Sequence, residues 1–179
     1  MKNKNATKYK SNLQEQRKAK DLKTHVVVAS GALWSAKGDV RNDRYLVECK
    51  TTKNPYYSLT IDTWNKIKKQ ANKDGLRIPL MCVDVEDGKH SIAIMSYLDF
   101  MGFDFDTKAQ YLGNPLPILV ENKSFRVTAD FIGADFPQSV DKGQYPCYRM
   151  DFKFVDFNKL HLVCIPWEDF IYLDSLITE

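Results

Sequence analysis

Hydrophobic and polar positions alternate with two different periods along the first hundred residues. In residues 60–75 apolar side chains recur every three to four positions, which predicts an amphipathic helix with lysines on its polar face. Thr60 is suited to cap the start of this helix, and Gly75 is suited to end it. The apolar stripe consists of Ile61, Trp64, Ile67 and Ala71.

Short runs rich in β-branched and aromatic residues lie on both sides of this helix and predict strands. They are residues 25–30 (HVVVAS), 44–51 (RYLVECKT), 78–85 (IPLMCVDV) and 91–97 (SIAIMSY). The last two flank EDGK, which predicts a hairpin turn. Because side chains alternate along a strand, Glu48 and Lys50 should face one way and Cys49 the other.

The N-terminal segment divides into two parts. Residues 1–10 are polar and basic without periodicity, which predicts a disordered arm. Residues 11–22 (SNLQEQRKAKDL) suit a helix, on which Glu15 shares a face with Ala19 and Leu22. A carboxylate on an apolar stripe indicates a partner or a metal, although an exposed glutamate on a frayed helix would give the same pattern.

The second half of the chain contains an internal repeat. Residues 81–100 and 152–170 share the order strand, short turn, strand, then an acidic residue and phenylalanine, so each predicts a hairpin that leads into a short helix or turn. We therefore expect an α/β fold with four parts. These are a disordered basic arm (1–10), a core (11–100), an inserted, partly β element (101–149), and a C-terminal hairpin and short helix packing on the core (150–179).

Composition excludes several classes of protein. No apolar run approaches the roughly 20 residues that span a bilayer, and the lysine-rich start lacks the apolar stretch of a secretory signal, so we expect a cytoplasmic protein without a membrane partner. The three histidines lack convergent partners, which disfavours histidine-based chemistry. The four cysteines have no CxxC spacing and no histidine at ligand spacing, which predicts reduced, mostly buried thiols.

Charge is divided unevenly along the chain. Residues 1–80 hold 18 Lys and Arg against 7 Asp and Glu, a net charge of +11, whereas residues 81–179 hold 8 against 16, a net charge of −8. A basic half of this strength favours a polyanionic partner, because basic side chains that displace counterions from phosphates gain affinity. A solvated lysine-rich surface is the alternative, and the acidic half could instead imitate DNA or dock a protein partner.

Residues 37–52 (KGDVRNDRYLVECKTT) combine the groups that phosphodiester hydrolysis requires. Carboxylates on separate elements can hold a divalent ion that activates water and neutralises the transition state, and a cation must face the phosphate. Asp39, which follows a glycine, and Glu48 with Lys50 on a strand provide this set. The backbone carbonyl of Cys49 is a further candidate ligand.

A second triplet in the chain tests how specific this pattern is. Glu121, Asn122 and Lys123 also follow an apolar run, but they lack an upstream Gly-Asp, a basic setting and a following lysine-faced helix. We therefore interpret that triplet as a strand end with a solvated turn.

Four segments in order, QEQRKAKDL, ASGALW, AKGDVRNDRYLVECKTT and TWNKIKKQA, resemble the PD-(D/E)xK nuclease superfamily, in particular its Holliday junction resolvase-like branch in archaea and phages. The resemblance covers residues 12–100. It implies a restriction-endonuclease-like mixed sheet flanked by helices, here with a β-rich C-terminal elaboration. It also implies a homodimer that requires Mg²⁺ or Mn²⁺.

The resemblance assigns a role to each matching residue. Asp39 and Glu48 would be the main metal ligands, and the helix-borne Glu15 would reach the metal directly or through water. Lys50 would orient the attacking water and stabilise the developing charge.

Supporting residues are implied in the same way. Gln70 matches a polar position on the following helix that supports catalysis, although it could simply bridge helix and sheet. Ser30 and Gly31 match a small-residue loop that approaches DNA. The candidate phosphate contacts are Lys37, Lys53, Lys66 and Lys69.

Three aromatic residues lie near these positions and have two interpretations each. Trp64 is favoured as a core residue over a platform for stacking bases. Tyr56 and Tyr57 follow Pro55 in an expected loop, where they could stack on unpaired bases, but closing the core under the helix is favoured.

These features together predict a metal-dependent, structure-selective DNA endonuclease that leaves 5′-phosphate and 3′-hydroxyl ends. Its substrate would be branched DNA. If the protein is encoded by a phage, it would act in the cytoplasm of a bacterial or archaeal host cell. The alternatives are a nuclease of the same fold that acts on duplex DNA or DNA ends, and a DNA-binding module without catalysis.

Overall fold

The computed structural model describes residues 4–27, 39–103, 118–120, 123–129, 153–157 and 159–177. Its helices are α1 (Lys4–Asp21), α2 (Ile61–Lys73), α3 (Tyr97–Met101) and α4 (Trp167–Ile177), with a 3-10 turn, η1 (Glu86–Gly88). Its strands are β1 (His25–Val26), β2 (Val40–Arg41), β3 (Tyr45–Thr51), β4 (Tyr56–Thr60), β5 (Ile78–Val85), β6 (His90–Ser96), β7 (Ile118–Val120), β8 (Ser124–Thr128), β9 (Lys153–Phe157) and β10 (Leu160–Pro166).

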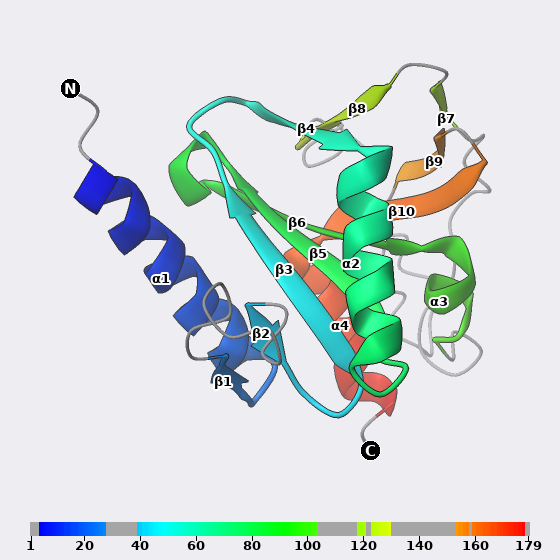
Figure 1. Cartoon of the computed structure of the whole chain (residues 1–179), viewed down its shortest axis with the longest axis horizontal. Coiled ribbons are helices and arrows are strands. Elements are labelled where there is room, and N and C mark those ends of the chain that lie inside the picture. The colour runs from blue at the N-terminus through cyan, green and yellow to red at the C-terminus, as the bar shows by residue number, and fades with distance from the viewer. Residues whose placement is uncertain are drawn as a thin grey trace, which may run out of the picture.

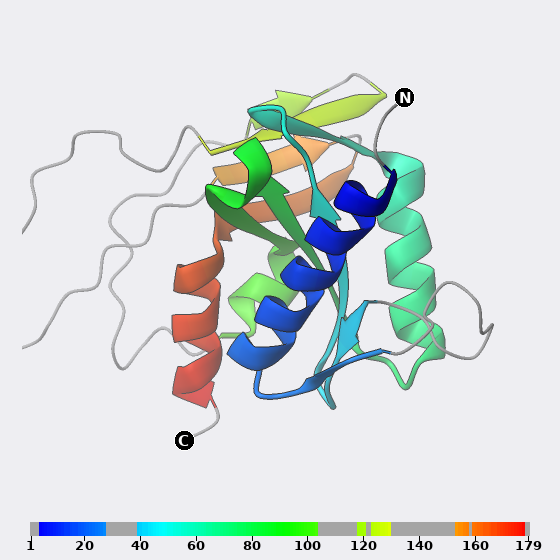
Figure 2. The same ribbon diagram turned by 90° about the vertical axis from the view of Figure 1, so that its left-hand side faces the viewer.

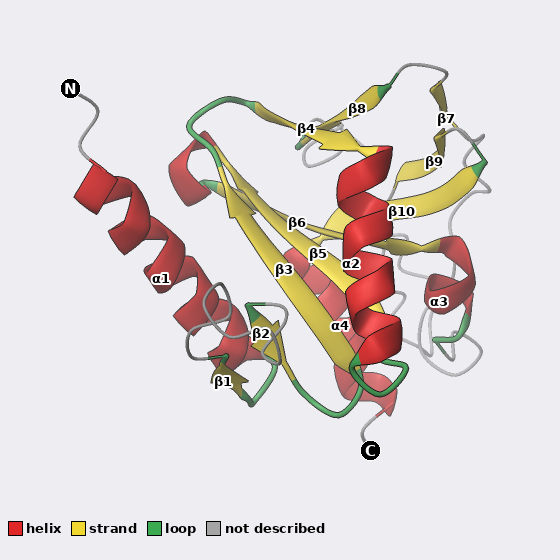
Figure 3. Ribbon diagram, viewed as in Figure 1, coloured by secondary structure: helices red, strands yellow, loops and turns green. Residues whose placement is uncertain are grey.

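The described strands form a mixed eight-stranded sheet and a separate two-stranded ribbon (Figures 1 and 3). The sheet has the order β1-β2-β3-β5-β6-β10-β9-β7, and β4 pairs with β8 in the ribbon. β3 and β5 are parallel, as are β7 and β9, and the other neighbours are antiparallel. Parallel neighbours need a crossover connection, and α2 supplies it between β3 and β5. The α/β class and the mixed sheet flanked by helices are therefore confirmed.

The sheet separates two hydrophobic cores. On one face α1, α3 and α4 bury Ala19, Phe100 and Phe170 against alternate residues of the strands. On the other face α2 and the ribbon bury Trp64 and Phe125 against the remaining strand residues. Figure 2 shows α4 and α2 on opposite sides of the sheet, with α1 crossing in front. Because both faces are covered, a polar group on a central strand requires a specific reason to lie there.

The helix α2 forms as its periodicity predicts. Trp64, Ile67 and Ala71 are buried, and Thr60 accepts a hydrogen bond from the backbone N–H of Thr63 over 3.1 Å as the N-cap. Gly75, directly after the helix, has a positive φ of 85°, which glycine adopts without a steric penalty. The interpretation of Trp64 as a core residue is confirmed, since its side chain is 1% exposed.

The prediction of a disordered arm at residues 1–10 is wrong for residues 4–10. Helix α1 begins at Lys4, seven residues before the expected N-cap, so Ser11 lies inside the helix. This stretch contains neither glycine nor proline, so nothing interrupts the helix, and Lys10 forms an ion pair with Asp87 over 2.9 Å. The helix is longer than its short apolar stripe suggested.

The repeated hairpin is confirmed. β5 and β6 lead into α3, while β9 and β10 lead into α4, and β6 pairs antiparallel with β10. The C-terminal segment therefore continues the core sheet and packs on it. Of the described residues between 101 and 149, Ile118–Val120 and Ser124–Thr128 form strands that also pair with neighbouring elements, β7 with β9 and β8 with β4.

Two strands differ from the expected elements. The expected loop around Tyr56 and Tyr57 is strand β4, whose Leu59 packs in a core with Phe125 of β8. A loop was expected because β4 is short and its partner strand lies far along the chain. The strand expected at residues 25–30 is seen as β1 at His25–Val26, and residues 28–30 lie outside the described residues.

Buried polar contacts hold the helix α1 in place, beside the apolar contacts of Ala19 and Leu22. The buried Lys18 ammonium lies 3.7 Å from Asp84 of β5 and donates to the Ser91 hydroxyl over 2.9 Å. Trp167 of α4 donates from its ring nitrogen to Asp21 over 2.8 Å. These bonds compensate the buried charges and fix how α1 lies on the sheet. None of the described helices is both long and apolar enough to cross a membrane.

Replacing Ile67 with alanine should lower the free energy of unfolding by about 2–4 kcal/mol, because a buried aliphatic side chain is lost and a cavity remains. Lys68→Ala, an exposed change in the same helix, should alter it by less than ~0.5 kcal/mol. Urea unfolding followed by circular dichroism measures both. Equal stability of the two variants would contradict the burial of this face of α2.

Candidate active site

The candidate site lies where β2 stops pairing with β3. The last pair of β2 and β3 is Val40 with Val47, and the backbone N–H of Asp39 still donates to the Val47 carbonyl over 2.9 Å. At the next amide that faces this edge, Cys49 N–H donates to Asp39 Oδ2 over 2.7 Å. A side-chain carboxylate thus replaces a neighbouring strand, which satisfies a backbone donor and holds Asp39 at the edge of β3.

Glu48 and Lys50 lie together on β3, as the alternation predicts. The Lys50 ammonium donates to Glu48 Oε1 over 2.6 Å, and both side chains are only partly exposed. Cys49, between them, is buried in the core on the α1 side of the sheet. The backbone therefore presents one carboxylate and one ammonium at a position where the sheet is otherwise apolar.

Glu15 reaches this region from α1. Its Oε1 accepts a hydrogen bond from the Ser11 hydroxyl over 3.0 Å, one turn earlier in the helix. Its negative charge contributes to the environment of Asp39, together with the charges of Glu48 and Lys50. The charges of Glu15, Glu48 and Lys50 therefore all act on Asp39, the fourth central residue of the sequence prediction.

Burial and neighbouring carboxylates raise the pKa of Asp39 from 3.8 to about 6. Burial is the largest cause, because it disfavours the charged form, and the negative charges of Glu48 and Glu15 add to it. The hydrogen bond from Cys49 and the charge of Lys50 act in the opposite direction but do not cancel the rise. An added cation would be stabilised at this position.

The pKa of Lys50 is raised, so its side chain stays protonated at neutral pH. Burial lowers this pKa, but the hydrogen bond and charge of Glu48 and the charge of Asp39 outweigh that effect. Tyr57 of β4 also lies near the pair: burial raises the pKa of its hydroxyl, Lys50 lowers it and Glu48 raises it. Tyr57 therefore provides a neutral hydroxyl beside the pair.

Gln14 is a polar neighbour that the sequence analysis missed. Its side chain is 1% exposed and its amide N–H donates to the Lys50 carbonyl over 2.9 Å, so it links α1 to the end of β3. Within the described residues, Gln14 Oε1 has no hydrogen-bond donor. The only available signal was that Gln14 and Lys18 are four residues apart, and two polar residues at this spacing normally indicate an exposed helix face.

The donor chemistry of the site fits a hard divalent cation. Carboxylate oxygens are the ligands that Mg²⁺ prefers, and the pKa of Asp39 is raised by burial first and by the charges of Glu48 and Glu15 in addition. In the described part of the chain, however, no three His, Cys, Asp or Glu side chains are grouped so that they could hold a metal ion. Glu15 and Glu48 each engage another side chain instead. The expected ligand set therefore stays a prediction.

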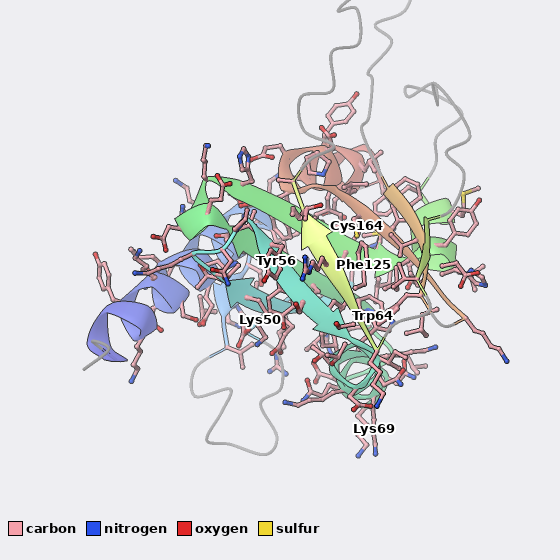
Figure 4. All side chains as sticks on the ribbon, turned by 90° about the horizontal axis from the view of Figure 1, so that it is seen from above. Lys50, Tyr56, Trp64, Lys69, Phe125 and Cys164 are labelled. Atoms are coloured by element: carbon pink, nitrogen blue, oxygen red, sulfur yellow. The ribbon has the colours of Figure 1, made fainter. Side chains whose placement is uncertain are left out.

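The predicted supporting residues are spread more widely. Gln70 on α2 is half-buried, and within the described residues no hydrogen bond joins its side chain to the four central residues. Lys53, Lys66 and Lys69 are exposed. Figure 4 shows Lys69 at the outer side of α2, well away from Lys50. Their roles in DNA binding stay predictions, and three further candidates lie outside the described residues: Ser30, Gly31 and Lys37.

The cysteines among the described residues are buried thiols. Cys49, Cys82 and Cys164 are free and buried, as the sequence predicted, and Cys147 lies outside the described residues. Burial raises the pKa of the Cys49 thiol well above its ordinary value, and it has the same effect on Cys82. Both thiols are therefore protonated and unreactive at neutral pH.

Comparison with known proteins gives no further assignment, since no family model, no curated protein and no solved structure matches the chain. The geometry of the described residues is therefore the basis of any functional inference.

The raised pKa of Asp39 predicts how stability depends on pH in the presence of a chelator. Between about pH 4 and pH 6 the folded state binds more protons than the unfolded chain, so this carboxyl makes the protein less stable as pH rises through that window. Asp39→Asn removes the effect while keeping an oxygen that can accept the Cys49 N–H.

The difference in the free energy of unfolding, variant minus natural protein, should therefore increase as pH rises from about 4 to 7. The increase should be at most about 2 kcal/mol, because solvent screens part of the effect. Urea titrations of both proteins at a series of pH values measure this difference. Parallel pH profiles would show that Asp39 ionises as it does in an unfolded chain.

Proposed function

We propose that this protein is a divalent-metal-dependent endonuclease that hydrolyses phosphodiester bonds in DNA. The observation that supports the proposal is the buried Asp39, on which the charges of Glu15, Glu48 and Lys50 act, beside the ion pair of Lys50 with Glu48. Paired acids that raise a pKa, with a lysine beside them, are typical of sites that handle charge during a reaction. An ordinary surface ion pair has two members, whereas here the carboxyls of Asp39 and Glu15 are found in addition to the pair of Lys50 and Glu48.

Asp39 and Glu48 are the residues that would hold the cation, with Glu15 and the Cys49 carbonyl as further ligands. N–H and C=O of one residue point to the same side of a strand, so the Cys49 carbonyl faces the edge at which Asp39 lies. When bound, a divalent cation supplies charge neutralisation and a water of lowered pKa. Asp39 must be ionised to take part, which the cation itself favours by opposing the repulsion of the carboxylates.

Lys50 supplies the fixed positive charge of the site. Its ammonium is held by Glu48 and is protonated at neutral pH, so it can stabilise the charge that develops on the phosphoryl oxygens and orient the attacking water. The nearby Tyr57 hydroxyl can donate a hydrogen bond to the same phosphate. Attack of water at phosphorus then breaks the bond to the leaving 3′ oxygen, which leaves a 3′-hydroxyl and a 5′-phosphate.

The mixed sheet flanked by helices is compatible with a restriction-endonuclease-like fold. We extend the proposal to branched DNA of the Holliday junction type, with a homodimer as the active form. A four-way junction is resolved by nicks in two opposed strands, and one copy of the chain offers one such cluster among its described residues. The basic N-terminal half supports a DNA partner through its net charge of +11, from 18 Lys and Arg against 7 Asp and Glu.

Replacing Glu48 with alanine should reduce Mg²⁺-dependent cleavage by about 100-fold or more, because it removes a candidate ligand and the partner of Lys50. DNA binding measured in chelator should persist. Glu168→Ala, a change at an exposed glutamate of α4, is the matched control and should cleave normally. Full activity of the Glu48 variant, or full activity of the natural protein in excess chelator, would refute the site.

A substrate panel tests the narrower proposal. With Mg²⁺, a four-way junction should be cut at least about tenfold faster than linear duplex, flap or single-stranded DNA of the same sequence, since a difference of this size needs only ~1.4 kcal/mol of selective transition-state binding. If linear duplex is cut as fast, the protein is a nuclease of another target class. Absence of cleavage with retained binding would instead favour a DNA-binding module.

A further inference from the structure

We propose that the outward face of the β4–β8 ribbon binds the DNA backbone beside the candidate site, with Arg126 held by Tyr56 as its phosphate contact. This inference rests on the proposed function, because it names a surface that presents DNA to that site. It concerns binding, however, so it can be tested apart from cleavage.

The ribbon has one apolar face and one polar face. Leu59 of β4 and Phe125 and Val127 of β8 are buried against the core that α2 covers. Because side chains alternate along a strand, the residues between them face away from this core. On the outward face lie Tyr56, Ser58 and Thr60 from β4 and Ser124, Arg126 and Thr128 from β8.

Arg126 is positioned by an aromatic ring. Its guanidinium carbon lies 4.7 Å from the centre of the Tyr56 ring, and Ser58 is its register partner on β4. Arg126 is exposed, whereas Tyr56 is half-buried and so gives it a fixed support. A guanidinium stacked on a ring keeps its N–H groups directed outward in one plane, which suits phosphate oxygens.

The charge of the ribbon favours a polyanion. The described residues of the ribbon and its preceding loop, 52–60 and 123–129, include Lys53, Lys123 and Arg126 but no acidic residue. Exposed hydroxyls at Ser58 and Ser124 add neutral donors of the kind that contact phosphates. A protein partner would be expected to need an apolar anchor, and on this face the only aromatic side chain, Tyr56, is already engaged by Arg126.

The ribbon also lies beside the candidate site. Tyr57, next to Tyr56 on β4, is close enough to Lys50 and Glu48 for their charges to act on its hydroxyl. In Figure 4, which looks down on the ribbon, Lys50 and Tyr56 are both seen toward the start of β4, away from α2. Tyr57 faces inward, so a backbone bound on the outward face would reach the Glu48 carboxylate of β3 around the start of β4.

The experiment measures the binding of a fluorescent 30-base-pair duplex and a four-way junction in chelator, over a range of salt concentrations. Arg126→Ala should weaken binding about tenfold to both DNAs and lower the slope of log affinity against log salt by about 0.9, the value for one lost phosphate contact. Lys20→Ala, at an exposed lysine in the last turn of α1 and at the end of the molecule away from the ribbon (Figure 1), is the matched control and should leave both quantities unchanged.

Two further variants separate the support from the charge. Tyr56→Leu should weaken binding less than Arg126→Ala does, because the charge remains but its position is lost, whereas Tyr56→Phe keeps the ring and should bind normally. Thermal unfolding of every variant reports on folding. Arg126 is exposed, so Arg126→Ala decides the question even if Tyr56→Leu fails to fold.

The inference is overturned if Arg126→Ala matches the natural protein in affinity and salt slope, or if the natural protein binds neither DNA. Loss of affinity in Arg126→Ala without any cleavage by the natural protein in Mg²⁺ supports this surface and refutes the nuclease. Cleavage that depends on Glu48, with normal binding by Arg126→Ala, supports the nuclease and refutes this surface.

Discussion

A single backbone hydrogen bond, from Cys49 N–H to the Asp39 carboxylate over 2.7 Å, determines where the candidate site lies. β2 pairs with β3 only as far as Val47, so the next edge amide needs another acceptor in a partly buried setting. A carboxylate provides it, and the bond in turn holds that carboxylate near Glu48 against their mutual repulsion. Burial is the largest cause of the raised pKa of Asp39, the charge of Glu48 adds to it, and the hydrogen bond from Cys49 opposes it. Under the proposed function, a bound cation would relieve the repulsion that Glu48 and Glu15 exert on Asp39.

Elements with a strong local pattern were predictable from the sequence, and elements that depend on distant partners were not. The stripe of α2 and the alternation that places Glu48 beside Lys50 need only neighbouring residues, and both agree with the structure. The strand at Tyr56 was missed because five residues carry little pattern and β8 completes it from far along the chain. Gln14 and Lys18 were missed because a polar spacing resembles an exposed face until Asp84 is placed beside it.

The charge of the chain also depends on the fold as much as on the sequence. By sequence, Arg126 belongs to the acidic half, residues 81–179, which has a net charge of −8 from 8 Lys and Arg against 16 Asp and Glu. In the structure β8 pairs with β4 of the basic half, so Arg126 lies opposite Ser58 of that half. The charges of the two halves therefore indicate a polyanionic partner, but they assign Arg126 to the wrong half of the surface.

The polar attachment of α1 gives Glu15 its position. Apolar contacts such as those of Ala19 tolerate small shifts of a helix, and a buried ion pair adds little net stability, but it does specify one register. Sliding α1 by one residue would move Glu15 by about 1.5 Å and turn it by about 100°. The bonds from Lys18 to Ser91 and from Gln14 to Lys50 would both be broken by that change. We therefore infer that these buried polar contacts fix the register at which the charge of Glu15 acts on Asp39, a register that an apolar interface would leave unspecified.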